Sequence, residues 1–421
     1  MGLVASCASS AICCAGSACC NCMCGTCMKC CKTSHHHHMR LGYLVLMIIA
    51  AGFGILFLYE GKNMMTPWTK YGLVNCDGNS ESVCLGVQTV YRESFALALF
   101  FLLMLFLSIP GGKFSAIINQ GAWIFKTLII IAIFIITFFI DNAFFDVWRE
   151  ICRYVSMFFL VIQIIILIDF AYTWNEDWLN KYEVSSSKGY WGFCLFFFSG
   201  LAWSLSITII ALCYYWFGTS SECGVNIFLI TLTLALGSIF TVMSLTPLVE
   251  NGSLLTSSIV NIYIVWLCWY GLVSDTSNCN SWNDTKSTGL TIAFGLLVLM
   301  IMLLYISFRE IKKSDKQTIA RDAAEVVMAP EDEGNEKEAY KEDEELDRRM
   351  VYFHVLMIIV SMYYSMLLTN WGAANVDGGA YDNDNASMWV KFVALWTTVL
   401  LYVWSLIAPK VCKNRDFSSQ I

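Results

Sequence analysis

Ten stretches of continuously apolar sequence run through this chain of 421 residues. They lie at about 39–59, 94–110, 123–140, 148–173, 190–217, 225–247, 254–273, 289–308, 351–370 and 388–408. Each is long enough, or nearly so, to cross the roughly 30 Å hydrocarbon core of a bilayer as a helix. Because the runs do not alternate between polar and apolar positions, helices are favoured over a β-barrel. The pattern predicts an all-α polytopic membrane protein with ten transmembrane helices.

The stretch from Asp141 to Tyr182 differs from the other apolar segments in length and in its polar ends. It contains no proline or glycine, so nothing local prevents it from forming one helix. About 40 residues would span roughly 60 Å, about twice the hydrocarbon thickness, so we expect a steep tilt or a projecting end. Arg149 and Arg153 lie toward one end, and Asp169 and Glu176 toward the other. We predict a long, polar-ended brace; the alternative is an ordinary spanning helix with solvated ends.

Composition supports a membrane protein and excludes a nucleic-acid-binding one. Hydrophobic residues make up 57% of the chain and charged residues only 14%, whereas about a quarter of the residues of a soluble domain are charged. The net charge of −7 is concentrated in one loop and says little about partners. No basic patch is interleaved with aromatic residues, so we expect no nucleic-acid partner.

Residues 1–38 form a cysteine-rich segment that holds ten of the 19 cysteines. The first six residues fit the M-G-x-x-x-[ST] pattern, which predicts N-myristoylation, and cysteines clustered before a spanning helix are typical of palmitoylation. The candidate acylation sites are Gly2, Cys7, Cys13 and Cys14. Metal binding with His35–His38 is an alternative. The run is too dense for cysteine pairs at fixed spacing, so we predict no metal site.

Basic residues of the loops gather mainly on the side that holds both chain ends, which predicts cytosolic termini. Four cysteines then fall in loops on the other side, where disulfides persist. Cys76 and Cys84 are close in sequence and are expected to pair, which leaves Cys223 to pair with Cys279. Two N-glycosylation sequons, at Asn283 and Asn385, fall on that same side. A third, at Asn251, falls on the cytosolic side and is expected to stay unmodified.

The segment 309–349 is the one long soluble loop predicted between the spans of 39–308 and those of 350–410, and a cytosolic tail occupies 411–421. The loop opens with basic residues, which suit the inner headgroup region, and becomes acidic from Glu331 onward. We interpret it as a disordered, solvated linker, with a docking site for a cytosolic partner as the alternative.

The sequence shows no catalytic set. H-E-x-x-H, G-x-S-x-G and glycine-rich phosphate loops are all missing, so we expect neither an enzyme nor a cofactor. Ionisable residues within membrane segments are functional candidates because their charge is unfavourable there. They include Arg92 at an expected helix start, Lys126, Lys391 and His354, although both lysines could instead snorkel to an interface. Single polar residues such as Gln163 suit a polar path, or else hydrogen bonds between helices.

Several stretches carry a family resemblance. They are Val90–Leu97 (VYRESFAL), Asn119–Lys126 (NQGAWIFK), Asp169–Trp178 (DFAYTWNEDW), Gly252–Tyr263 with Cys279-Asn280, Tyr352–His354 leading to Leu368–Trp371, Trp389–Lys391, Tyr402–Trp404 and Ala408-Pro409. In this order, after a cysteine-rich start and with a late acidic loop, they resemble the serine incorporator family of eukaryotic membrane proteins. The cysteine density and the histidine tract go beyond what is typical of that family.

The resemblance implies ten membrane helices in two bundles crossed by a long diagonal helix. It also implies an integral protein of the endomembrane system or plasma membrane whose partners are phospholipids and sterols. Two family functions compete: assistance in incorporating serine into phosphatidylserine and sphingolipids, and non-selective movement of phospholipids between leaflets. We favour the second because no serine-activating site is visible. The candidate lipid pathway comprises Arg149, Arg153, Gln163, Asp169, Glu176, Arg92, Lys126 and Lys391.

Two alternatives to lipid movement stay open. A non-catalytic scaffold would gather lipid-synthesis enzymes through the 309–349 loop. Separately, we expect that the chain can form a homo-oligomer. A small-solute carrier would instead show a sequence repeat and half-helices broken at mid-membrane, and neither is evident in the sequence.

Overall fold

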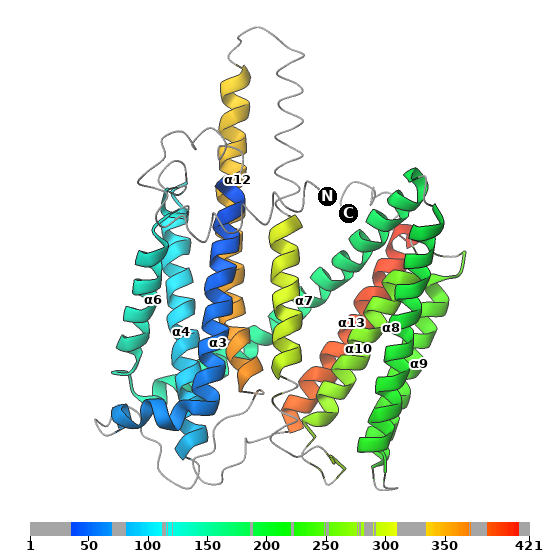
Figure 1. Ribbon diagram of the computed structural model, residues 1–421, viewed down its shortest axis with the longest axis horizontal. Helices are drawn as coiled ribbons and strands as arrows, with labels where there is room; N and C mark the ends of the chain where they lie inside the picture. Colours follow the sequence, from blue (N-terminus) through cyan, green and yellow to red (C-terminus); the bar gives the residue numbers. More distant parts are fainter. Residues whose placement is uncertain are drawn as a thin grey trace.

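The computed structural model describes residues 35–69, 81–111, 115, 117–119, 121–185, 188–219, 223–247, 249, 252–275, 277, 279–281, 289, 292–309, 334–369, 371 and 385–411. All regular elements within these residues are helices (Figure 1). They are α3 (His35–Thr69), α4 (Glu81–Ser108), α6 (Trp123–Thr137), α7 (Asn142–Val184), α8 (Lys188–Phe217), α9 (Gly224–Ser244), α10 (Leu254–Val273), α12 (Gly334–Leu368) and α13 (Asn385–Val411). One more helical span, Ile292–Arg309, lies between α10 and α12 in the sequence.

Nine helices of the described part are long and apolar enough to cross a membrane, which confirms the prediction of an all-α polytopic membrane protein. The tenth expected span corresponds to α6, a shorter apolar helix of 15 residues. At 1.5 Å per residue α6 is roughly 22 Å long, less than the hydrocarbon thickness. Tight turns at Phe138, Phe139 and Ile140 follow it, each residue donating to the carbonyl three positions back.

The helices form two bundles (Figure 1). In the first bundle, α3, α6 and α12 pack on α4; in the second, α8, α9 and α13 pack on α10. Within the described residues, no helix of the first bundle packs extensively on a helix of the second bundle. The two-bundle arrangement that the resemblance implied is therefore present.

The helix α7 crosses between the bundles diagonally (Figure 1). Its 43 residues give a length of about 65 Å. It begins after Asp141, whose carboxylate accepts a hydrogen bond from the Ala143 amide at 3.1 Å and so caps the first turn. It packs on α4 and α12 at one end and on α8, α10 and α13 at the other. The predicted brace is confirmed, and the alternative of an ordinary spanning helix is wrong.

The span Ile292–Arg309 is the second element that lies between the bundles. The ring of Phe294 lies 5.6 Å from that of Trp266 on α10. Gly295 lies against Leu367 of α12, so closely that a side chain there would displace the leucine. This span therefore joins α10 of the second bundle to α12 of the first.

Four helix ends share one side of the molecule: the starts of α3 and α12, and the ends of α13 and of Ile292–Arg309 (Figure 1). We call this the terminal side, and the other the opposite side. This arrangement agrees with the even number of crossings predicted from the sequence.

Two helix boundaries differ from the sequence prediction. The helix α4 begins at Glu81 rather than near residue 94, because no proline interrupts 81–93 and a membrane-embedded backbone needs helical hydrogen bonds. The helix α12 begins at Gly334, so residues 334–349 of the expected disordered loop are helical. That stretch is rich in Glu, Lys and Arg, which favour helix, and after Gly334 it contains neither glycine nor proline.

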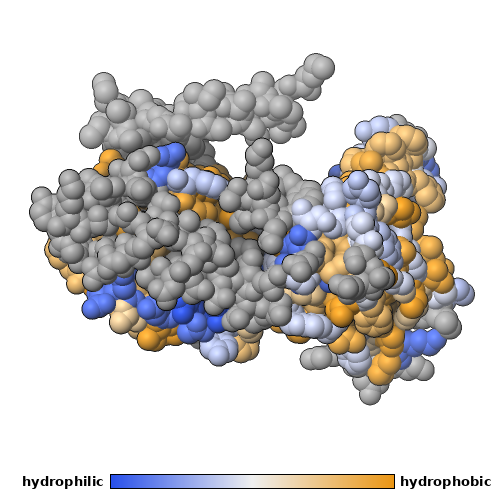
Figure 2. All heavy atoms as spheres, turned by 90° about the horizontal axis from the view of Figure 1, so that it is seen from below, coloured by the Kyte–Doolittle hydropathy of each residue, from blue (hydrophilic) through white to orange (hydrophobic). Residues whose placement is uncertain are grey.

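Hydrophobic side chains cover the outside of both bundles. Exposed examples are Ile124 and Leu128 on α6, and Phe196 and Leu201 on α8. Seen from below, hydrophobic residues surround the second bundle, on the right of Figure 2. This outward apolar surface is the one that a lipid environment requires.

Candidate functional site

The candidate site is the seam, which we define as α7, the span Ile292–Arg309 and the faces of α10, α12 and α13 that they contact. One face of α7 is buried, including Phe159 and Leu167, while Phe158 and Ile165 on its other face point outward. The predicted pathway residues of α7 therefore differ in the neighbouring helix that each one contacts.

Arg149 and Arg153 form a local charged network near the start of α7. Arg149 pairs with Asp146 and with Glu150, each at 3.3 Å, and Arg153 pairs with Glu150 at 3.1 Å. Arg153 also donates to the backbone carbonyl of Trp371, at 3.4 Å, just beyond the end of α12. Local ion pairing thus accounts for both arginines, and Arg153 additionally ties α7 to the first bundle.

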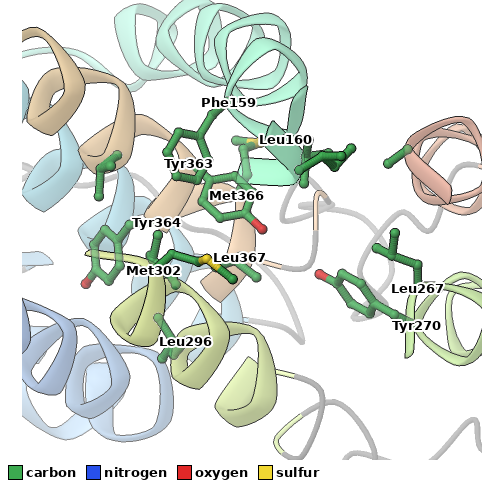
Figure 3. Close-up of a cluster of buried hydrophobic side chains, with 14 of the residues drawn as sticks. Phe159, Leu160, Leu267, Tyr270, Leu296, Met302, Tyr363, Tyr364, Met366 and Leu367 are labelled. Atoms are coloured by element: carbon green, nitrogen blue, oxygen red, sulfur yellow. The ribbon is translucent and has the colours of Figure 1, made fainter. Parts of the chain in front are cut away.

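The middle of the seam is packed with apolar and aromatic side chains (Figure 3). The ring of Phe159 lies 4.6 Å from that of Tyr363 on α12. Met302 and Leu296 of the Ile292–Arg309 span lie beside Leu367 in the same cluster (Figure 3). These contacts fill the part of the seam where α7, α12 and the Ile292–Arg309 span meet.

Gln163 lies in this apolar region without a hydrogen-bond partner. Its side chain is 1% exposed, and neither its amide nitrogen nor its amide oxygen is bonded. The hydroxyl of Ser156, two turns earlier on the same helix, is also buried and unbonded. Leaving a buried polar group unpaired costs about 1–3 kcal/mol, so the closed seam is unfavourable for Gln163.

Asp169 is bonded to the Ile292–Arg309 span near the terminal side. Tyr305 donates its hydroxyl proton to the Asp169 carboxylate at 2.7 Å, and Arg309 forms an ion pair with the same carboxylate oxygen. Thr173 contacts the Tyr305 hydroxyl at 3.1 Å. Because the single Tyr305 proton goes to Asp169, Thr173 is the donor in that contact. Glu176, two turns further on α7, is exposed.

These groups are spread along α7 rather than gathered at one point. The rise along the helix is about 15 Å from Arg153 to Gln163 and about 9 Å from Gln163 to Asp169. The polar contacts at the two ends close the seam, and the unpaired amide lies between them. This arrangement suits a path that opens and closes, and it does not assemble a reaction centre.

Arg92 lies in the interior of α4, so its expected position at a helix start is wrong. It is fully buried and donates to the side chain of Asn142 at 2.7 Å and to the carbonyl of Ile140 at 3.3 Å. Its guanidinium lies 4.3 Å from the ring centre of Phe145. Arg92 thus fixes the chain reversal that leads into α7, away from the middle of the seam.

Lys126 is buried in the first bundle and does not snorkel to an interface. Its ammonium donates to the carbonyl of Asn119 at 3.0 Å and lies 4.2 Å from the ring centre of Trp123. The Asn119 side chain oxygen is 2.9 Å from a ring nitrogen of His354 and accepts from Tyr43 at 3.1 Å. This network joins α3, α6 and α12 and is separate from the seam.

Lys391 on α13 is also buried rather than snorkelling. Its ammonium donates to the hydroxyl of Ser274 and lies 3.5 Å from the ring centre of Tyr270. Tyr270 points from α10 toward the seam (Figure 3). Lys391 therefore supports one wall of the seam on the opposite side, whereas Lys126 and Arg92 do not line its middle.

Tyr305 is a site residue that sequence reasoning missed. A signal for Tyr305 was available, because Tyr305 and Arg309 are four apart and so share a helix face. Their common partner Asp169 lies on another helix far away in sequence, and only the fold shows that contact.

The expected disulfide between Cys223 and Cys279 is present, with a Cα–Cα distance of 5.7 Å. It connects the start of α9 to the loop after α10. Cys84 is also disulfide-bonded, while Cys76, its expected partner, lies outside the described residues. The free cysteines of the described part are Cys152, Cys194, Cys213 and Cys268.

Of the remaining predicted sites, Asn385 is the one that lies among the described residues. The acylation sites Gly2, Cys7, Cys13 and Cys14 and the sequon residue Asn283 lie outside the described residues. Asn385 is the first residue of α13, on the opposite side. In the part of the chain that the structure covers, no group of three His, Cys, Asp or Glu side chains is arranged to hold a metal ion.

Comparisons with known proteins match nearly the whole chain. A family model described as "Serine incorporator (Serinc)" matches residues 12–415. The chain is 28% identical to serine incorporator 3 of Bos taurus, over 94% of this chain and 97% of the relative. It is 29% identical to a probable serine incorporator of Nematostella vectensis, over 96% and 94%. It is 28% identical to serine incorporator 2 of Homo sapiens, over 95% and 97%.

Proposed function

Because the chain belongs to the serine incorporator family, we propose that it moves phospholipids between membrane leaflets, without lipid selectivity and without enzymatic turnover. Its cargo is the phospholipid itself, with sterols as further membrane partners. The protein is an integral membrane protein. We place it in the endomembrane system or plasma membrane, with its terminal side in the cytosol.

The observation that carries this proposal is the way the bundles are connected. Among the described helices, α7 and the span Ile292–Arg309 are the elements that pack on both bundles. A relative movement of the bundles therefore changes few contacts other than those of the seam. Such movement would separate two apolar faces along a line that runs from one membrane surface toward the other.

The polar groups of the seam suit the passage of a headgroup. A zwitterionic or charged headgroup is unfavourable in hydrocarbon unless polar groups or water accompany it. Arg153 lies near one end of the seam, Asp169 near the other, and Gln163 between them with an unpaired amide. Separation of the bundles would let the Gln163 amide bond to water or to the passing headgroup.

The described arrangement represents the closed form in this proposal. The Phe159–Tyr363 contact fills the middle, and the Asp169 contacts with Tyr305 and Arg309 close the terminal side. Opening must break the Asp169 contacts or move α7 together with the Ile292–Arg309 span. The lipid tails would meanwhile stay in the surrounding bilayer, because the outer faces of both bundles are apolar.

Reconstitution tests the proposal. The purified full chain is placed in vesicles that contain a phospholipid with a dithionite-sensitive headgroup label, and bleaching is followed with time. We expect bleaching to proceed beyond the outer leaflet in protein-containing vesicles and to stop there in empty ones. Equal results for a phosphatidylcholine and a phosphatidylserine label would support the lack of selectivity. Bleaching confined to the outer leaflet in the presence of protein would reject lipid movement.

A scaffold for lipid-synthesis enzymes is the second candidate, and the start of α12 favours it. The helix begins at Gly334, so its acidic first half continues directly into the membrane-spanning half that starts at Met350 (Figure 1). A partner bound to that half would be held rigidly relative to the first bundle. Replacing 336–347 with a neutral helical sequence should then lower serine labelling of cellular lipids while leaving scrambling unchanged, and unchanged labelling would reject the scaffold.

A further inference from the structure

Glu93 is a carboxylic acid side chain buried inside a membrane span. It lies on α4 within the span Cys84–Ser108, and it is 7% exposed. It faces α3 and α12 rather than the seam, so the proposed lipid pathway does not use it. Ionisable groups in such positions are rare because their charge is strongly unfavourable there.

The neighbours of Glu93 form a short hydrogen-bonded chain across three helices. The Tyr364 hydroxyl of α12 lies 2.9 Å from the Glu93 carboxylate oxygen Oε2 and 3.2 Å from the backbone carbonyl of Ala50 on α3. Gly54, one turn after Ala50, makes room for this contact. A Cβ at that position would overlap the Tyr364 hydroxyl and approach Glu93 Oε2 to 2.9 Å.

No cation compensates Glu93 within the described residues. Arg92 is adjacent in sequence, but its guanidinium points toward Asn142 and Phe145. On α7, Arg149 and Arg153 are paired with Asp146 and Glu150. From α12 the titratable group that faces Glu93 is Tyr364, and from α3 the contacts are the Ala50 backbone and Gly54.

Counting hydrogens then distinguishes the two protonation states. The Tyr364 hydroxyl has one proton but lies within bonding distance of two acceptors. If Glu93 were ionised, Tyr364 would donate to it and the carboxylate would keep its charge in an apolar surrounding. If Glu93 carries a proton, it donates to Tyr364, which in turn donates to Ala50, and every group in the chain is used once.

We propose that Glu93 is a proton-binding site, held as a neutral carboxylic acid at neutral pH, whose proton links α4 through Tyr364 to α3. The ligand is a proton, and its binding is independent of whether the protein moves lipids. Loss of this proton would leave an uncompensated carboxylate between α3, α4 and α12, which the apolar packing of the first bundle does not accommodate. The first bundle therefore contains a contact between helices that requires protonation.

Infrared spectroscopy tests this assignment. The full chain, reconstituted in lipid at neutral pH and labelled with ¹³C at glutamate side-chain carboxyl groups, is compared with its unlabelled form. We expect a protonated-carboxyl carbonyl band that shifts with the label and disappears in Glu93→Gln. The matched control Glu150→Gln, at an exposed ion pair, should leave that band unchanged.

A second variant keeps the test informative if Glu93→Gln fails to fold. In Tyr364→Phe the protonated band should persist and move to higher frequency, because the acid loses its acceptor. The proposal is overturned if the wild-type chain shows no glutamate band of a protonated carboxyl. It is also overturned if the band is present but survives in folded Glu93→Gln, or is unmoved in Tyr364→Phe.

Discussion

Tyr305 donates a hydrogen bond of 2.7 Å to Asp169, and this bond connects two helices that are 136 positions apart in sequence. Asp169 lies on the diagonal helix α7, and Tyr305 lies on the span Ile292–Arg309. Arg309 on the same face pairs with the same carboxylate. These contacts join α7 to the Ile292–Arg309 span on the terminal side of the seam, and in the proposed function they must break or move before lipid passes.

Removing the Tyr305 hydroxyl should loosen the seam. In Tyr305→Phe the Asp169 carboxylate keeps Arg309 but loses a hydrogen bond, and Thr173 loses its acceptor. We expect a loss of about 1–2 kcal/mol in stability. If opening limits lipid passage, scrambling should become roughly fivefold to thirtyfold faster. Thermal unfolding in detergent and dithionite bleaching in vesicles measure the two effects.

Tyr215→Phe is the matched control, because Tyr215 is 75% exposed on the outer face of α8. It should change neither quantity. Slower scrambling in Tyr305→Phe would show that this hydroxyl assists passage rather than closing the seam.

Gln163 should show opposite effects on stability and transport. Replacing it with leucine removes an amide whose nitrogen and oxygen are both unpaired, so Gln163→Leu should stabilise the protein by about 1–3 kcal/mol. The same change removes the polar group at the middle of the proposed path and should slow scrambling. Thermal unfolding and the vesicle assay on the same preparation provide the comparison.

Asn226→Leu is the control for this replacement. The Asn226 amide donates to Asp275 at 2.9 Å, so its loss should destabilise the protein by about 1–3 kcal/mol. If Gln163→Leu destabilises to the same extent, the Gln163 amide has partners in the membrane, and the argument from its unpaired state is wrong.

The Cys223–Cys279 disulfide closes a segment of 56 residues that contains α9 and α10. Replacing both cysteines with alanine should lower stability by about 2–4 kcal/mol, because the unfolded chain gains freedom. Thermal unfolding of the double variant measures the loss, and Cys194→Ala, at a free cysteine, should leave stability unchanged. An unaltered melting temperature in the double variant would mean that this bridge is not formed in the purified protein.

Glycosylation can establish the orientation of the chain. The sequons at Asn283 and Asn385 are predicted to carry glycans, whereas Asn251 is predicted to carry none. Digestion with an N-glycosidase should raise gel mobility in the wild type, with a smaller change in Asn385→Gln. A glycan at Asn251 instead would reverse the orientation and place the terminal side outside the cytosol.

The sequence was sufficient to predict the membrane-spanning parts of the helices and the diagonal brace. Residues 141–182 hold no helix-breaking residue across a length well beyond that of a bilayer, and the observed helix Asn142–Val184 follows directly from that. The start of α4 was missed because Arg92 and Glu93 interrupt the apolar pattern. Inside the fold, Arg92 is hydrogen-bonded to Asn142, and Glu93 is hydrogen-bonded to Tyr364.

The candidate site could be predicted only in part. Arg153, Gln163 and Asp169 were selected because polar groups in membrane segments need an explanation, and all three lie on the helix that forms the seam. Arg92 and Lys126 met the same criterion but belong to networks within the first bundle. The distinction depends on contacts such as Lys126 with Asn119, and periodicity does not show which face of a buried helix meets which neighbour.

Photocrosslinking tests most directly whether lipid passes through the seam. Vesicles containing the full chain and a phospholipid with a photoreactive headgroup are irradiated during scrambling, and crosslinked peptides are identified by mass spectrometry. The account predicts crosslinks around Gln163 on α7 and on the Ile292–Arg309 span, and fewer of them in Gln163→Leu. Crosslinks confined to the outer faces of α6 and α8, with none in the seam, would contradict it.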